Sequence, residues 1–594
     1  SYIVLNILYK KLNCNAIRNT FSSKKSTIGL ISGPLSFFII LLSSLFLQSQ
    51  LFENNQGHDS VTLFTTAAPF IALATMAWML VWWVTECVPM GFTGLLAPFI
   101  FILFGILTPE QALSKFSDPI IWIFISGFIL AAAFKKSRLD ERIAYKLGTL
   151  YKGNNPKIAI FFVACLPVFV LSMTGSITAS TTIVFPLVMA FLKVSHVPFN
   201  SENSNKDRNQ SLNPNSSKGI NRKNHSMNEK THKKSNYEEA SFLSLGQAAT
   251  AGAMLLLIST APNLIAKSTV EDFVPGESIS FTDWFIVGAP HAILGLLISW
   301  NIIFLFIKPE FKSISSSTSQ FKEKLKGLGK ITREEKAVLV ILFSALILWV
   351  VPSVLRSFYP SSSDTSESID NISLLIGKIA NSIPISIPAL LIILSIGLVK
   401  LKYSNLNEGE RLKKEISGIK DEEKIKQTKA SVIRPILTWE EMLKAIDWNI
   451  IFLFGGGLVL GLGIENSGLA SIISNEISII AGSHLTELSL FALSAILGFI
   501  LSYAASNTAS AVIACPIAAS LAIGAGINPI PPIIAAALGA SISSAIPSAT
   551  PPMAIVYSSK AISILNMFKT GMMSDLLRLV LLILLGPPLI QLIY

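Results

Sequence analysis

Short groups of hydroxyl and amide side chains interrupt two long apolar segments of this chain. Ser506-Asn507-Thr508 divides the segment 485–525, and Ser176-Ile177-Thr178 divides the segment 158–195. Polar groups in the middle of a membrane segment are tolerated only where they are buried in protein or line a watery cavity. The repeated interruption therefore predicts a solute-binding site at mid-membrane depth.

Proline interrupts two further apolar segments, at Ser259-Thr260-Ala261-Pro262-Asn263 and at Ala549-Thr550-Pro551-Pro552. Proline removes a backbone donor and clashes with the preceding turn, so each segment should unwind there. The freed helix N-termini carry partial positive charge, and the freed carbonyls suit a small cation. We call the two polar interruptions the tips and the two proline interruptions the breaks.

An anion at these tips and breaks would be held by helix ends, amides and hydroxyls, because no Lys or Arg is expected near mid-membrane depth in the four elements. Bound cations would offset its charge. The candidate substrate ligands are Ser176, Thr178, Thr260, Asn263, Ser506, Asn507, Thr508, Thr550 and Pro551. Serine and threonine also help apolar helices to pack. That interpretation is the better one for any single residue, whereas the duplication of the set favours a site.

Composition predicts an all-α polytopic membrane protein. Of 594 residues, 51% are hydrophobic and only 14% are charged, against about 25% charged in soluble proteins. The net charge of +11 does not indicate nucleic-acid binding, because the basic residues lie in loops. The four cysteines form no C-x-x-C pair, and no cofactor is expected.

Eleven membrane spans are expected in addition to two re-entrant hairpins at 158–195 and 485–525. The spans lie at 28–48, 67–84, 90–107, 120–135, 241–268, 282–307, 337–355, 375–399, 446–464, 529–558 and 572–594. Basic residues should collect on the cytoplasmic side. They do so in alternate loops only if both hairpins return to the side from which they entered. This layout predicts a cytoplasmic N-terminus and an outer or luminal C-terminus, in the plasma membrane or an endomembrane.

The chain divides into membrane parts and polar parts. The expected units are an N-terminal segment 1–27, membrane parts 28–198, 240–401 and 436–594, and polar cytoplasmic inserts 199–239 and 402–435. We expect both inserts to be solvated or disordered.

The membrane parts also repeat. Gly127 and Gly457 are 330 residues apart, as are Pro186 and Pro516, and the two breaks are 290 apart. The span count places one hairpin on the inside and its copy on the outside, so the repeats should be inverted.

Four sequence runs resemble the divalent anion:sodium symporter family, which includes sodium-coupled di- and tricarboxylate transporters and sodium–sulfate symporters. These runs are S-N-T at Ser506–Thr508, A-T-P-P at the second break, W-W-x-T-E-x-x-P at Trp82–Pro89 and F-G-G-G at Phe454–Gly457. The likeness extends over nearly all of 65–594. It implies a homodimer in membrane lipid, with a fixed scaffold part and a transport part that moves like an elevator.

The resemblance also implies two sodium sites, one per hairpin. The second would use Ser502 and Asn507 with the carbonyls of Ala505 and Ala549. The first would use Ser172 and Ser176 with a carbonyl near Ser259. The chain departs from the family pattern in the first repeat, where Ile177 replaces an asparagine and Ser259 replaces a glycine.

Several interpretations stay open on the sequence alone. The expected substrates are di- or tricarboxylates such as succinate, malate and citrate, with sodium as the coupling ion. Because Ile177 offers no oxygen to a cation, sodium-independent anion exchange is an alternative, as is transport of sulfate or another inorganic anion. A channel and a membrane-embedded enzyme are more distant alternatives, and no catalytic motif supports the enzyme. We interpret His291 as a packing residue, Glu86 and Glu465 as interfacial or capping residues, and Asp118 as a helix cap.

Overall fold

Helices form almost all of the described chain. The computed structural model describes residues 24–52, 60–194, 235–314, 318–358, 375–376, 378–380, 382–384, 386–402, 433–472 and 486–594. Within them, ten helical segments are long and apolar enough to cross a membrane, and four shorter apolar helices accompany them. The prediction of an all-α polytopic membrane protein is confirmed.

Each expected span corresponds to one helix or to a broken pair of helices. The spans are α3 (Lys24–Phe52), α4 (Ser60–Thr85), α5 with α6 (Met90–Gly94 and Leu96–Leu103), α8 (Pro119–Ser137), α13 with α14 (Asn236–Gly252 and Ala261–Phe273), α15 (Phe281–Phe306), α17 (Arg333–Phe358), α19 (Ser386–Leu398), α23 (Trp448–Asn466), α27 with α28 (Ile530–Ala540 and Pro551–Tyr557) and α29 (Ile564–Ile590). Two bounds differ from expectation. The span 90–107 is divided at Leu95, and α29 begins at Ile564 rather than 572.

Both hairpins are present as pairs of packed arms. The first consists of α10 (Pro156–Ile160), η2 (Phe161–Cys165), α11 (Leu166–Leu171) and η3 (Ser172–Thr174), followed by α12 (Ile177–Val194). The second consists of α25 (Glu487–Ala504) and α26 (Asn507–Gly524). The element η2 is a single π-helical turn. In each hairpin the second arm packs against the first.

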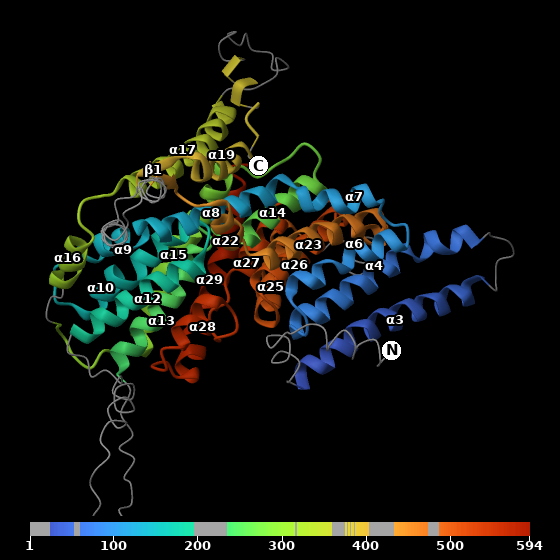
Figure 1. The fold of residues 1–594 in the computed structure, drawn as a ribbon. Coiled ribbons are helices and arrows are strands. Elements are labelled where there is room, and N and C mark those ends of the chain that lie inside the picture. Colours follow the sequence, from blue (N-terminus) through green and yellow to red (C-terminus); the bar gives the residue numbers. More distant parts are fainter. Residues whose placement is uncertain are drawn as a thin grey trace, which may run out of the picture.

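Short helices cover the ends of the bundle. They are α7 (Pro109–Ser114), η1 (Lys115–Ser117), α9 (Leu139–Gly148), α16 (Thr318–Gly327) and α22 (Trp439–Ala445). In Figure 1, α3 and α4 lie side by side and extend to the right of the body, while α17 and α19 form a second pair that rises from it.

The inserts are shorter than expected at the ends that the structure describes. Helix α13 begins at Asn236, inside the expected insert 199–239, because Ser235 caps its first turn and accepts a hydrogen bond from Glu238 N. At the second insert, β1 (Lys400–Lys402) pairs antiparallel with β2 (Ile433–Pro435), so its two ends meet in a small ribbon. The rest of both inserts lies outside the described residues.

The repeat extends to the helix caps. Thr108 and Thr438, 330 residues apart, each form a capping box, at the start of α7 and α22. Asp118 then caps α8, as predicted, and Asp447 caps α23. A capping side chain satisfies a backbone N–H that the first helical turn leaves free. The two halves of the chain therefore share their local starting signals as well as their motifs.

The two hairpins make equivalent contacts in the two repeats. Helix α12 packs against α13 and α28, which also pack against each other. Correspondingly, α26 packs against α27 and α14, which pack against each other. Each hairpin thus lies between the first half of its own broken span and the second half of the other one, as two copies related by a twofold axis would.

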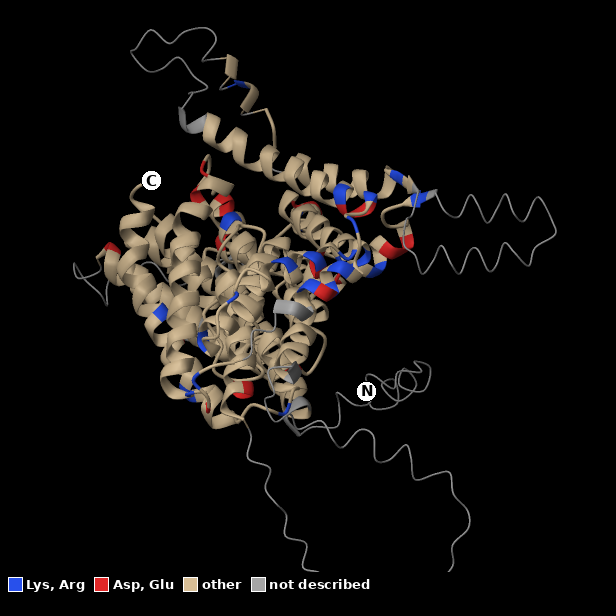
Figure 2. Cartoon of the chain, turned by 90° about the vertical axis from the view of Figure 1, so that its left-hand side faces the viewer, with Lys and Arg blue, Asp and Glu red and all other residues tan. Residues whose placement is uncertain are grey.

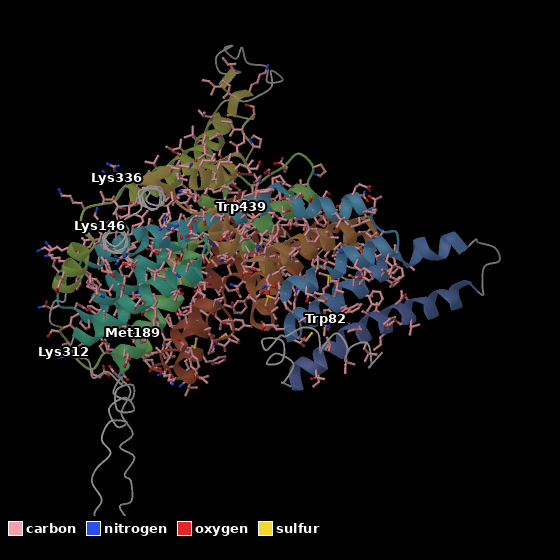
Figure 3. The ribbon with its side chains drawn as sticks, viewed as in Figure 1. Trp82, Lys146, Met189, Lys312, Lys336 and Trp439 are labelled. Atoms are coloured by element: carbon pink, nitrogen blue, oxygen red, sulfur yellow. The ribbon has the colours of Figure 1, made fainter. Side chains whose placement is uncertain are left out.

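Charged side chains lie mainly at the ends of helices, and the bundle between them is largely uncharged (Figure 2). Arg142 of α9 pairs with Glu335 of α17 at 2.8 Å, and Lys136 of α8 pairs with Glu441 of α22 at 2.6 Å. Lys146, Lys312 and Lys336 come from two loops expected on the cytoplasmic side. All three lie toward the left of the molecule in Figure 3, away from Trp82.

Candidate functional site

The second tip is a two-residue extended link between helices. Helix α25 ends at Ala504, Ala505 and Ser506 are extended, and α26 begins at Asn507. The Ser506 hydroxyl accepts a hydrogen bond from Ala509 N at 3.3 Å and so caps α26. The Asn507 Oδ1 atom accepts one from the hydroxyl of Ser543, in the second break, at 3.0 Å. A polar contact therefore joins the second tip to the second break.

The first tip has the same cap but a tighter turn. Ser176 accepts from Ala179 N at 3.2 Å, and Gly175 before it has φ of 93°, a conformation that glycine adopts readily. A Cβ atom on Gly175 would lie 3.4 Å from the carbonyl oxygen of Ile258, in the first break. The first tip therefore lies against the first break through backbone.

Ser172 lies one turn before the first tip and is fully buried against the broken span. Its hydroxyl donates to Val168 O at 2.7 Å. A Cβ atom on Gly252 of α13 would come within 2.8 Å of the Ser172 Cβ. Only a glycine leaves room for this approach.

The first break is held by its own side chains. The Asn263 amide donates to the carbonyls of Ala253 and Leu256, both at 2.8 Å. The Thr260 hydroxyl lies 3.2 Å from Asn263 Oδ1 and 3.3 Å from Ala253 O. Trp284 of α15 adds a hydrogen bond to Met254 O at 3.0 Å. Asn263 therefore organises the unwound backbone, and its role as a substrate ligand stays a prediction.

The second break is held from outside, by an acidic residue on α29. Asp575 accepts hydrogen bonds from Ser544 N at 2.6 Å, the Ser544 hydroxyl at 2.8 Å and the Tyr503 hydroxyl at 2.5 Å. The same tyrosine oxygen accepts from Ala545 N at 3.3 Å. Two consecutive amides of the second break are therefore satisfied by groups on α29 and α25.

Carbonyl oxygens remain available at the positions expected to hold sodium. Among the described residues, no backbone N–H donates to the carbonyl of Ser259, Ala505 or Ala549. The Thr550 hydroxyl oxygen is buried and has no hydrogen-bond partner within that part of the chain. Neutral oxygen donors of this kind suit a hard, weakly held cation, and the described residues contain no cluster of His, Cys, Asp and Glu that could bind a metal.

The predicted residues differ in their exposure. Thr178 and Pro551 are exposed, whereas Ser176, Thr260, Ser506, Asn507 and Thr508 are partly exposed. Those expected to reach only a cation are sealed, namely Ser172, Ser259, Ser502, Ala505 and Ala549. Asn263 and Thr550 are also buried. The structure joins each tip to its own break, and the partly exposed hydroxyls border these contacts.

Sequence reasoning missed the groups that support the second break. Asp575 and Arg578 are almost completely buried on α29, with Nη1 and Oδ1 3.5 Å apart. Two opposite charges one turn apart in an apolar 27-residue helix were the available signal, because ionisable residues within membrane segments are costly and usually functional. Their partners, Tyr503 and Ser544, carry no such signal.

The other sequence candidates have structural roles or lie elsewhere. His291 is buried, with Nδ1 2.6 Å from Val287 O, which agrees with a packing role. A cavity of about 480 Å³ lies between the start of α25, the turn before α27 and the end of α29, and no predicted site residue lines it.

Paired helical hairpins packed against two broken spans, with neutral polar groups at every interruption, define a polytopic membrane transporter. The sequence matches the profile of a family described as the sodium:sulfate symporter transmembrane region over residues 63–592. The chain therefore belongs to this family, the divalent anion:sodium symporters, and it is a transporter rather than an enzyme.

Known relatives are transporters of similar length. The sodium-dependent dicarboxylate transporter SdcS of Staphylococcus saprophyticus is 29% identical over 574 residues, covering 95% of this chain and 93% of the relative. An SdcS of Staphylococcus aureus is 29% identical over 456 residues, covering 77% and 70%. Among solved structures, the YdaH transporter of Alcanivorax borkumensis aligns with a TM-score of 0.47 at 11% identity, covering 81% of this chain and 88% of that one. At that score it contributes nothing to the assignment.

Proposed function

We propose that this protein carries small divalent carboxylates across a membrane together with sodium. The observation that carries the proposal is the second tip, where Asn507 contacts Ser543 beside the free carbonyls of Ala505 and Ala549. The names of the relatives point in the same direction, since they are sodium-dependent dicarboxylate transporters.

The anion would bind between the two tips and the two breaks. The N-termini of α12, α26 and α14 offer free N–H groups and partial positive charge. Ser176, Thr178, Thr260, Ser506 and Thr508 offer hydroxyls that are at least partly exposed. Thr550, although buried, has an unpartnered hydroxyl beside Pro551. A site of hydroxyls and amides binds a dianion reversibly because it holds no fixed opposite charge that would trap it.

Sodium would neutralise part of the bound charge. Ser502, Asn507 and the carbonyls of Ala505 and Ala549 form the proposed second sodium site. Ser172, Ser176 and the Ser259 carbonyl form the proposed first one. Because the tip-and-break pairs pack as a unit, we infer that they move together against the remaining helices, in the manner of an elevator.

A specific observation favours a second candidate function, anion exchange with fewer sodium ions or none. In the second repeat Asn507 bonds to Ser543, but the equivalent positions in the first repeat are Ile177 and Ala253. Both members of the polar contact are therefore apolar there. A first sodium site would lack the amide oxygen of the tip and depend on hydroxyls and a carbonyl alone.

The remaining assignments belong to the same proposal. We infer a homodimer in membrane lipid, in the plasma membrane or an endomembrane, with the N-terminus cytoplasmic and the C-terminus outside. Citrate and sulfate are the competing substrates. No cofactor and no nucleic acid take part in the proposed reaction.

Uptake into proteoliposomes tests the proposal. Radiolabelled succinate, malate, citrate and sulfate would be supplied with an inward sodium gradient, with a matched choline gradient, and with each unlabelled anion preloaded. Sodium-driven, saturable succinate or malate uptake is the expected result. Uptake that needs a preloaded anion and ignores sodium would select the exchanger, and sulfate-only uptake would contradict the carboxylate assignment.

A further inference from the structure

Two opposite charges lie buried together in helix α29. The side chain of Asp575 is 0% exposed and that of Arg578 is 2% exposed, and the pair is separated by one helical turn. Burial of an ion pair is costly unless further hydrogen bonds satisfy its donors and acceptors. The partners that supply those bonds therefore show what the pair holds in place.

On its acidic side the pair fixes the second break. Asp575 receives three hydrogen bonds, two from Ser544 and one from Tyr503. Ser544 follows Ser543, which bonds to Asn507 of the second tip, and Tyr503 follows Ser502. One carboxylate thus reaches the immediate neighbours of two residues proposed to hold the second sodium ion.

On its basic side the pair reaches the first repeat. Arg578 Nη1 donates to the Thr250 hydroxyl at 3.3 Å, and Nη2 to the Thr250 carbonyl at 3.4 Å. The arginine stem crosses α15 at Gly295, where a Cβ atom would lie 3.1 Å from Nε. Thr250 is two residues before Gly252, which faces Ser172. The guanidinium therefore holds the end of α13 next to the proposed first sodium site.

We propose that Asp575 and Arg578 are positioning residues that couple the two sodium sites. Neither touches substrate or ion; together they fix the second break relative to the end of α13. A cation that draws in Ser543 and Asn507 shifts Ser544, and Asp575 passes that shift through Arg578 to Thr250. Sodium binding at one repeat then alters the affinity at the other. The inference rests on the proposed function and extends it to how the two sites are coupled.

The first test removes one hydroxyl. Tyr503→Phe loses a hydrogen bond to Asp575 and leaves both charges paired, so the protein should fold. The matched control is Tyr237→Phe, which removes another buried hydroxyl, bonded to Pro156 O at 3.0 Å and remote from both tips. The readout is the rise in apparent Tm of the purified protein as sodium replaces choline at constant ionic strength. Sodium-driven succinate uptake is measured in parallel.

Tyr503→Phe should raise the sodium concentration for half-maximal stabilisation at least about tenfold, the factor expected for one hydrogen bond to a charged group. Tyr237→Phe should lower the starting Tm without moving the sodium midpoint. Equal midpoints in both variants, or a wild-type protein whose Tm ignores sodium, would overturn the inference. Wild-type protein that is stabilised by sodium but takes up no succinate would contradict the proposed function and leave the positioning pair standing.

The second test separates positioning from mere stability. Asp575→Asn leaves a buried arginine without its counter-charge and should lower the yield of folded protein. Adding Arg578→Gln removes that unpaired charge and should restore much of the yield, while the sodium midpoint stays raised. A double variant that recovers both would show a purely structural pair. Glu239→Gln is the control, since Glu239 is a buried carboxylate that bonds to Ser563 and Asn566 at the other end of α13.

Discussion

The two breaks share a backbone and differ in what holds it. Ser259 N donates to Leu256 O at 2.9 Å, and Ala549 N donates to Ile546 O at 3.2 Å, 290 residues later. A threonine in extended conformation precedes the next helix in both. Asn263 then staples the first break from within, while the second, with Met553 at the equivalent position, relies on Asp575 and Tyr503.

This difference separates structure from ion binding. The first break is largely self-sufficient, and its tip faces it with Ile177 rather than an amide. The second break is exposed to influence from two other helices, and its tip contacts it through Asn507. We infer that the first repeat serves mainly as a frame and that the second carries most of the ion dependence.

The largest expected effect comes from making the second tip like the first. Asn507→Ile removes an oxygen from the proposed sodium site and leaves the Ser543 hydroxyl without its partner. Sodium-driven uptake should fall by about 100-fold or more, the factor for two lost polar contacts. The apparent Tm should change little, because Asn507 is partly exposed. Initial-rate uptake at several sodium concentrations measures it; uptake within threefold of wild type would refute the assigned role.

The reverse outcome is expected at the first break. Asn263→Met leaves two buried carbonyls unsatisfied and should lower the free energy of unfolding by about 2–4 kcal/mol. The apparent Tm in detergent measures the loss. Asn301→Ala, which removes an exposed amide bonded only to Leu297 O, is the control and should be nearly neutral. A stable Asn263→Met protein would show that this break is held by other contacts.

The comparison can also be sharpened by making the first tip like the second. Ile177→Asn combined with Ala253→Ser supplies both members of the missing polar contact. The sodium concentration for half-maximal uptake should fall by about tenfold, as one new charge-assisted contact allows. Ile177→Asn alone should give a smaller gain, because its amide lacks the hydroxyl partner. If neither variant alters sodium dependence, Ile177 is not what distinguishes the two sites.

The smallest expected effect lies in α9, outside the candidate spans. Burial raises the pKa of Asp140 to about 6, whereas its repeat counterpart is Ala470. A carboxyl whose folded pKa is raised stabilises the fold below its unfolded pKa and loses that contribution as pH rises through about 6. Asp140→Asn should therefore raise stability at pH 7.5 by about 1 kcal/mol.

Apparent Tm between pH 5 and pH 8 checks this prediction. The gap between Asp140→Asn and wild type should close at low pH. Glu141→Gln, at a neighbouring carboxylate that pairs with Arg138 near the surface, should show no such pattern. A constant gap across the pH range would mean that Asp140 does not titrate there.

Features coded by neighbouring residues were predicted well. Both hairpins, both breaks and the Asp118 cap follow from local apolar runs, prolines and capping residues, and the structure places all of them where expected. The family assignment rested on the same short motifs and is confirmed. The individual ligand roles at the tips stay predictions.

Features that depend on distant partners were not predictable. Arg578 meets Thr250 across 328 positions, and Tyr503 meets Asp575 across 72. Nothing in a single sequence pairs such residues, since each is one polar group among many. The ends of the inserts were misjudged for a related reason, because Glu239 reads as a solvated charge until Ser563 and Asn566 are seen beside it.

The π-helical turn at Phe161–Cys165 accounts for an uneven count between the two hairpins. Asn155, which starts the first arm, precedes Ser176 by one residue more than Thr486 precedes Ser506. A wide turn of this kind accommodates one extra residue within an otherwise regular helix. An insertion on one side of the ancestral duplication was thereby absorbed far from the tip, and the capping serines kept their register.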